Sequence, residues 1–227
     1  MRMIRGVGFD LDGTLFDHRG SARIGIDGFF RSLGIAPSDE ARRSWFTAEE
    51  EQFELWRAGS ISFREQRRRR LLIVLPPLGA AVPDDPDSLD ALFEQYAHAY
   101  RDAWRPFDDS ATLLRALRRD GYRTGILTNG SHEQQVDKLR VTGLYDLVNV
   151  VCTSERIGLA KPDVGAFSAL ADHMGIPPAE CLFVGDHAEH DVAGAESAGM
   201  SAVLVDRCGR HAEGIGEAVR AALAPWA

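Results

Sequence analysis

The chain of 227 residues has little cysteine and no long apolar run. Its three cysteines, Cys152, Cys181 and Cys208, have neither metal-ligand spacing nor the even count of a disulfide framework. We expect Cys152 and Cys181 to be buried thiols in strands, in a protein of a reducing compartment. No apolar run approaches the ~20 residues of a membrane span, and the N-terminus has no signal-peptide pattern. We therefore expect a cytoplasmic protein that does not enter membranes.

Basic residues are fewer than acidic ones. The chain has 26 lysines and arginines against 34 aspartates and glutamates, a formal net charge of −8. Nucleic acid polymers and anionic membranes repel such a chain, so we expect neither as a partner. A few well-placed cations can still bind a phosphate group locally. The sequence is compatible with a monomer or a homodimer.

The order of predicted elements indicates an α/β fold. Residues 107–227 alternate between helix and strand patterns, and residues 4–9 add a buried strand at the start. Alternation of this kind predicts a Rossmann-like parallel five-stranded sheet flanked by helices. The expected strands are residues 4–9, 123–127, 148–152, 181–184 and 202–205. The intervening residues 17–106 have a wholly helical pattern, with expected helix starts after Ser38 and Ser62.

Two aspartates follow the first predicted strand. Asp10 and Asp12 are two residues apart, so in an extended chain their side chains point the same way. Gly13 then allows a sharp turn before Thr14. Two acids at a strand end can serve different purposes, one as nucleophile or metal ligand and the other as proton donor.

Polar residues also follow the later strands. Thr128 and Asn129 end the second strand and suit an anion, Lys161 opens a helix, and Asp186 and Asp191 follow the fourth strand. Ligands of open parallel sheets bind at the carboxyl ends of the strands, so we expect these side chains to lie together. Oxygen ligands of this kind favour Mg²⁺.

Two other groups of residues need an interpretation. His187 and His190 are spaced as in some transition-metal sites, but the surrounding carboxylates favour Mg²⁺. The Arg67–Arg70 run points all round a helix, so we expect one or two of these arginines at most to face a site and the rest to be solvated. Arg57 and Arg64 are further candidates for substrate contact.

The polar residues at the strand ends form four motifs in the order of a known superfamily. They are Asp10-Leu11-Asp12-Gly13-Thr14, Thr128, Lys161, and Asp186 with Asp191. The set resembles the motifs of the haloacid dehalogenase-like (HAD) hydrolases. The helical stretch after motif one is typical of their subfamily I phosphatases with a C1 cap. The resemblance implies an α/β core of residues 1–16 and 107–227, and a helical C1 cap of residues 17–106.

The resemblance implies a Mg²⁺-dependent phosphatase that acts on a small phosphorylated metabolite, a phosphate monoester. Asp10 would be the nucleophile and would form an aspartyl-phosphate, Asp12 the general acid and base, and Lys161 the neutralising cation. Thr128, Asn129 and Lys161 would bind the phosphate. The expected metal ligands are Asp10, Asp12 through its backbone carbonyl, Asp186 and Asp191.

Three alternatives have to be weighed. A phosphomutase shares every core motif and stays open. A haloacid dehalogenase needs neither the second aspartate nor Mg²⁺, so Asp12 and the predicted metal acids disfavour it. A non-catalytic binding module has no need to keep Asp10, Asp12, Lys161 and Asp186 together.

Overall fold

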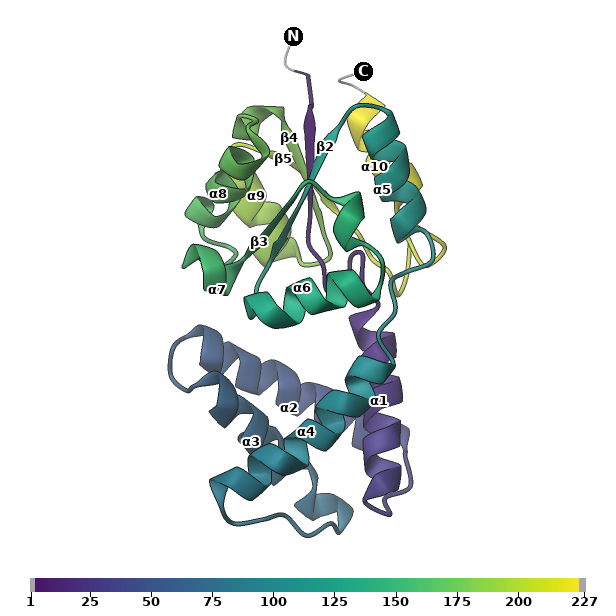
Figure 1. Ribbon diagram of the computed structural model, residues 1–227, viewed down its shortest axis with the longest axis vertical. Helices are drawn as coiled ribbons and strands as arrows, with labels where there is room; N and C mark the ends of the chain where they lie inside the picture. Colours follow the sequence, from purple (N-terminus) through teal and green to yellow (C-terminus); the bar gives the residue numbers. More distant parts are fainter. Residues whose placement is uncertain (1–2, 225–227) are drawn as a thin grey trace. The chain divides into compact units, whose positions relative to one another are not determined.

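The computed structural model describes residues 3–224. These residues divide into two compact units. We call residues up to 18 and from 104 onward the α/β unit, and residues 19–103 the helical unit. The helical unit is an insertion, since the chain leaves the α/β unit after its first strand and returns to it (Figure 1).

The α/β unit is built on a five-stranded parallel sheet, as the sequence predicts, and the order of its strands is β3-β2-β1-β4-β5. Its strands are β1 (Gly6–Phe9), β2 (Arg123–Thr128), β3 (Val150–Thr153), β4 (Cys181–Gly185) and β5 (Ser201–Leu204). Strand β1 is central, and its last residue, Phe9, is in register with Ile126 of β2 and Val184 of β4. Residues that follow β1, β2 and β4 therefore emerge at one edge of the sheet.

Helices cover both faces of this sheet, with α8 and α9 on one side and α5 and α10 on the other (Figure 1). The helices of this unit are α5 (Ser110–Arg119), α6 (His132–Val141), α7 (Ser154–Ile157), α8 (Val164–Met174), α9 (Gly194–Ser197) and α10 (Gly216–Leu223). Short turns of helix are η2 (Tyr145–Leu147), η3 (Pro178–Glu180) and η4 (Ala188–Ala193). Gly8 of β1 allows close packing of α8, because a Cβ there would lie 2.6 Å from Leu170.

The helical unit contains α1 (His18–Ser32), α2 (Asp39–Arg57), α3 (Phe63–Val74), η1 (Pro76–Leu78) and α4 (Pro86–Asp102). The two serines predicted to precede helices cap them: Ser38 Oγ accepts from the backbone N–H of Ala41, and Ser62 Oγ from that of Glu65, both at 3.1 Å. The core of this unit is aromatic, and its rings belong to Phe29, Phe30, Trp45, Phe93 and Tyr96.

Each arginine of the Arg67–Arg70 run pairs with an acid of the helical unit. The partners are Glu94 for Arg67, Asp90 for Arg68, Glu65 for Arg69 and Glu49 for Arg70. Arg70 is buried, with its guanidinium 4.9 Å from the Trp45 ring centroid. The expectation of a solvated arginine face is therefore wrong for Arg70, which packs among the aromatic rings.

A buried arginine ties the turn after β1, at Thr14, to the rest of the α/β unit. Arg207 Nε and Nη2 donate to the backbone carbonyl of Thr14 at 2.9 and 2.7 Å, and Nη1 donates to Asp109 at 2.7 Å. Beside it, Ser110 Oγ donates to the carbonyl of Leu15 at 2.8 Å. Both connections to the helical unit are thus anchored in the α/β unit.

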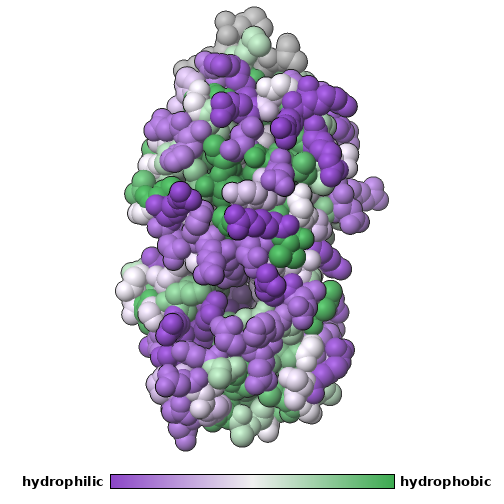
Figure 2. All heavy atoms as spheres, in the orientation of Figure 1, coloured by the Kyte–Doolittle hydropathy of each residue, from purple (hydrophilic) through white to green (hydrophobic). Residues whose placement is uncertain are grey.

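Polar residues cover much of the visible face of each unit (Figure 2). Within residues 3–224, every helix is too short or too polar to cross a bilayer. The sequence prediction for two of the cysteines is confirmed, since Cys152 and Cys181 are buried and Cys208 is exposed.

Thiol labelling tests this burial. Burial raises the pKa of Cys152 and of Cys181 to about 11, and the thiolate is the reactive form. At pH 8 we expect iodoacetamide to modify Cys208 alone in the folded protein, and all three cysteines in urea, as read by peptide mass mapping. Labelling of Cys152 or Cys181 in the folded protein at the rate of Cys208 would contradict this packing.

Candidate functional site

One lysine bridges two aspartates at the carboxyl edge of the sheet. Lys161 Nζ donates to Asp10 Oδ1 and to Asp191 Oδ1, both at 2.6 Å, and all three residues are buried. Asp10 directly follows β1, and its backbone N–H donates to the carbonyl of Val184 in β4 at 2.9 Å. The end of β1 is therefore fixed against the end of β4, from which Asp186 follows.

Asp186 completes a group of three carboxylates. Oxygens of Asp10, Asp186 and Asp191 lie within 4.8 Å of one another. Burial and the charges of Asp191 and Asp186 raise the pKa of Asp10 well above its usual range, although Lys161 opposes this. Burial and the charge of Asp191 raise the pKa of Asp186 to about 6, while exposure to solvent screens part of this repulsion. Three acids thus share one lysine, and the site carries surplus negative charge.

The donor set fits a hard divalent cation. Asp10 Oδ2 is buried and has no hydrogen-bond partner among the described residues, so it can serve as an oxygen ligand. Gly13 leaves room for Asp186, because a Cβ at position 13 would lie 2.2 Å from Asp186 Oδ2. The φ of Gly13 is +90°, which favours glycine. Asp186 is exposed, which gives the group access from solvent.

The two histidines between Asp186 and Asp191 build the turn that holds Asp191. His187 Nδ1 accepts from the backbone N–H of His190 at 3.1 Å, and the two rings stack with centroids 4.1 Å apart. The backbone N–H of His187 donates to Asp191 Oδ2 at 3.0 Å. These contacts lie at the start of the π-helical turn η4, so the histidine pair has a structural use that needs no metal.

Thr128 and Asn129, at the end of β2, form hydrogen bonds with other residues of the α/β unit. Asn129 Nδ2 donates to the backbone carbonyl of Lys161 at 2.9 Å, and its Oδ1 accepts from the backbone N–H of Lys161 at 2.8 Å. Thr128 is buried, and its Oγ1 accepts from Gln135 Nε2 at 2.7 Å. The amide of Asn129 therefore fixes the backbone of Lys161, and the phosphate contacts predicted for Thr128 and Asn129 stay predictions.

Asp12 is held by a second lysine. Lys138 Nζ donates to Asp12 Oδ1 at 2.6 Å and to Oδ2 at 2.9 Å, and Gln135 Nε2 donates to Oδ2 at 2.9 Å. His18 Nδ1 lies 4.0 Å from Asp12 Oδ1. Burial opposes ionisation of Asp12, but the charges of Lys138 and His18 lower its pKa to about 2. Asp12 is thus ionised at neutral pH.

Comparison with known proteins assigns the family. A family model described as haloacid dehalogenase-like hydrolase matches residues 4–199. The chain belongs to the HAD-like hydrolases.

HAD-like proteins of several kinds resemble the chain. It is 31% identical over 205 residues to the glyceraldehyde 3-phosphate phosphatase of Methanothermobacter thermautotrophicus, covering 90% of this chain and 86% of the relative. It is 40% identical over 139 residues to the phosphatase MT3486 of Mycobacterium tuberculosis, but this match covers 61% of the chain and only 59% of that protein.

Solved structures share the HAD-like fold. The HAD-hydrolase YfnB of Bacillus subtilis, described as bound to magnesium, has a TM-score of 0.76 at 20% identity, covering 92% of this chain and 89% of its own. The L-2-haloacid dehalogenase PA0810 has a TM-score of 0.72 at 23% identity, covering 91% and 88%. At these identities the likeness concerns the fold alone.

The sequence patterns predict the polar residues that the structure brings together at the strand ends, but they do not predict three residues that bind this part of the chain. Gln135 and Lys138 bind Asp12, and Arg207 binds the carbonyl of Thr14. One signal was available for Lys138: the chain has only two lysines, Lys138 and Lys161, among its 26 basic residues. Both lie at this site.

Removal of the bridging lysine should destabilise the HAD-like fold. Lys161→Met leaves the buried Asp10 and Asp191 carboxylates uncompensated, so we expect a loss of about 3–5 kcal/mol in the free energy of unfolding at pH 7.5. An acid whose folded-state pKa is raised costs stability above that pKa, and the cost is relieved as the pH falls through it. The loss should therefore shrink at pH 5.5.

Urea denaturation at both pH values measures this loss. Arg140→Met, which removes an exposed cation from α6, is the control and should change little. An equal loss at both pH values, or none, would contradict the account of Lys161.

Proposed function

We propose that the protein is a Mg²⁺-dependent phosphatase that hydrolyses a small phosphate monoester through an aspartyl-phosphate on Asp10. The observation that carries the proposal is the Asp10 carboxylate, with one oxygen on Lys161 and the other buried without a hydrogen-bond partner in the described structure. Lys161 orients this carboxylate, and its unpartnered oxygen is open to a cation, as a metal-assisted nucleophile requires. The names of the relatives that cover most of the chain, which are phosphatases, support the same reaction.

The proposed metal ligands are the carboxylates of Asp10 and Asp186 and the backbone carbonyl of Asp12, with Asp191 beside them. Mg²⁺, when bound, would offset the surplus negative charge and that of the phosphoryl oxygens. Asp191 already accepts from Lys161 and from the backbone of His187. The proposed role of Asp191 is therefore to orient Lys161 and also to offset the charge of the metal ion.

The proposed reaction has two steps on Asp10. A carboxylate oxygen of Asp10 attacks phosphorus, the bond to the leaving oxygen breaks, and the leaving alkoxide takes the proton that Asp12 carries. Water then attacks the aspartyl-phosphate, gives up a proton to Asp12 and releases inorganic phosphate, which restores Asp10. Lys161 neutralises charge throughout. Asp12 is ionised at rest, so for the first step it has to take up a proton from solvent, and in the second step it regains a proton from the attacking water.

We propose that the helical unit serves as the cap that selects the substrate. All of the family motifs lie in the α/β unit, so substrate choice falls to residues outside it. A small phosphorylated metabolite fits the names of the relatives, which include the phosphoglycolate phosphatase of Escherichia coli, 28% identical over 203 residues. We also propose a cytoplasmic location, which the three free cysteines support.

Phosphate release from a panel of phosphorylated metabolites tests the proposal. We expect release from at least one compound with Mg²⁺, loss of release after chelation, and recovery with Mg²⁺ but not with Ca²⁺, which takes more ligands at longer distances. The Asp10→Asn variant, purified in parallel, is the control for contaminating phosphatases and should be inactive.

Three results would contradict the proposal. Undiminished activity after exhaustive chelation would exclude the metal role. Conversion of a sugar phosphate to its isomer without phosphate release would indicate a mutase. Halide release from a 2-haloacid without phosphatase activity would indicate a dehalogenase.

A further inference from the structure

Helix α6 presents two donors to one carboxylate. Gln135 and Lys138 are one turn apart, so their side chains lie on the same face of the helix. Both are buried, and together they make three contacts to Asp12 of 2.6 to 2.9 Å. Asp12 has no freedom to turn without breaking contacts to a buried cation.

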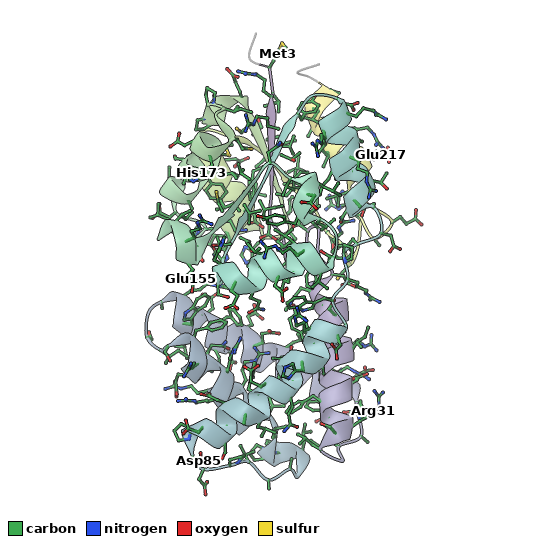
Figure 3. All side chains as sticks on the ribbon, viewed as in Figure 1. Met3, Arg31, Asp85, Glu155, His173 and Glu217 are labelled. Carbon is green, nitrogen blue, oxygen red and sulfur yellow. The ribbon has the colours of Figure 1, made fainter. Side chains whose placement is uncertain are left out.

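The two donors are themselves held in place. Gln135 Nε2 also donates to Thr128 Oγ1 at 2.7 Å, which ties it to the end of β2. Lys138 Nζ lies 4.9 Å from the centroid of the Phe16 ring. The start of α6 is fixed by Glu155 of α7, labelled in Figure 3, which accepts from the backbone N–H of His132 at 2.8 Å. The two residues that bind Asp12 are therefore themselves held by contacts to β2, to Phe16 and, through the start of α6, to α7.

Each of the two lysines of the chain binds one of the two proposed catalytic acids. Lys161 binds Asp10, and Lys138 binds Asp12. The other 24 basic residues, by count of the sequence, are arginines. Lysine differs from arginine in carrying a compact ammonium group with three donors on a flexible stem, where arginine carries a planar fork. Lysine occurs at only these two positions of the sequence, and each lysine contacts one of the proposed catalytic acids.

We propose that Lys138 and Gln135 are positioning residues that hold the Asp12 carboxylate in the orientation needed for proton transfer. The inference rests on the proposed function. It goes beyond the four family motifs, none of which includes a residue of α6. A misplacement of about 1 Å can cost ~10²-fold in rate. Loss of either donor should therefore act on turnover through Asp12, and much less on substrate binding.

A double-mutant cycle on kcat separates this role from a purely structural one. For an alkyl phosphate, Lys138→Met should lower kcat ~10- to 100-fold and leave KM within about threefold. In the Asp12→Asn background the same change should lower kcat by less than about threefold, because the residue through which Lys138 acts is already lost. Gln135→Met should behave in the same way with a smaller loss, and Lys138→Arg should recover part of the activity.

The chain offers matched controls for both changes. Arg140→Met removes a cation from α6, and Gln134→Met removes the neighbouring amide, without touching the Asp12 contacts. Both should keep the wild-type kcat. An aryl phosphate, whose leaving group departs without a proton, should show a smaller loss than the alkyl phosphate with Lys138→Met.

The outcomes distinguish the inference from the proposed function. Equal losses from Lys138→Met in the wild-type and Asp12→Asn backgrounds, with an active wild-type enzyme, would overturn the inference and leave the phosphatase standing. A rise in KM alone would also overturn it. An inactive wild-type enzyme would overturn both. If Lys138→Met does not fold, as judged by thermal denaturation, the Gln135→Met cycle decides.

Discussion

The site depends on one lysine that bridges two buried carboxylates. Taking a charge out of water costs several kcal/mol, so Asp10 and Asp191 can stay together only with a cation between them. Lys161 supplies it, and Asn129 fixes the backbone from which it reaches them. Because β1 is paired with both β2 and β4, residues distant in sequence meet at one edge of the sheet.

The two acids of the first motif are separated by environment. In an extended chain Asp10 and Asp12 would share surroundings, but Asp10 lies beside Asp186, for which Gly13 leaves room, while Asp12 is bound by α6. The pKa of Asp10 is raised by burial and like charges, and that of Asp12 is lowered by Lys138. The two acids therefore differ in electrostatic environment although only one residue separates them in the chain.

The sequence predicts the parallel sheet and the polar residues at the strand ends because both follow from local patterns. The strand ends carry Asp10, Thr128 and Asp186 as expected. Gln135 and Lys138 escaped prediction because mid-helix polar residues have no local signal for a partner more than a hundred positions earlier. The buried Arg70 escaped for a similar reason, since its partners come from other helices.

The most direct test of the central claim is to trap the phosphoryl group on Asp10. The Asp12→Asn variant should slow attack by water, so an aryl phosphate with Mg²⁺ should leave an adduct that survives rapid acid quenching. Intact-protein and peptide mass spectrometry locate it. The account predicts one phosphoryl group on Asp10 and none in the Asp10→Asn, Asp12→Asn double variant. An adduct on another residue, or turnover by Asp10→Asn at the wild-type rate, would contradict it.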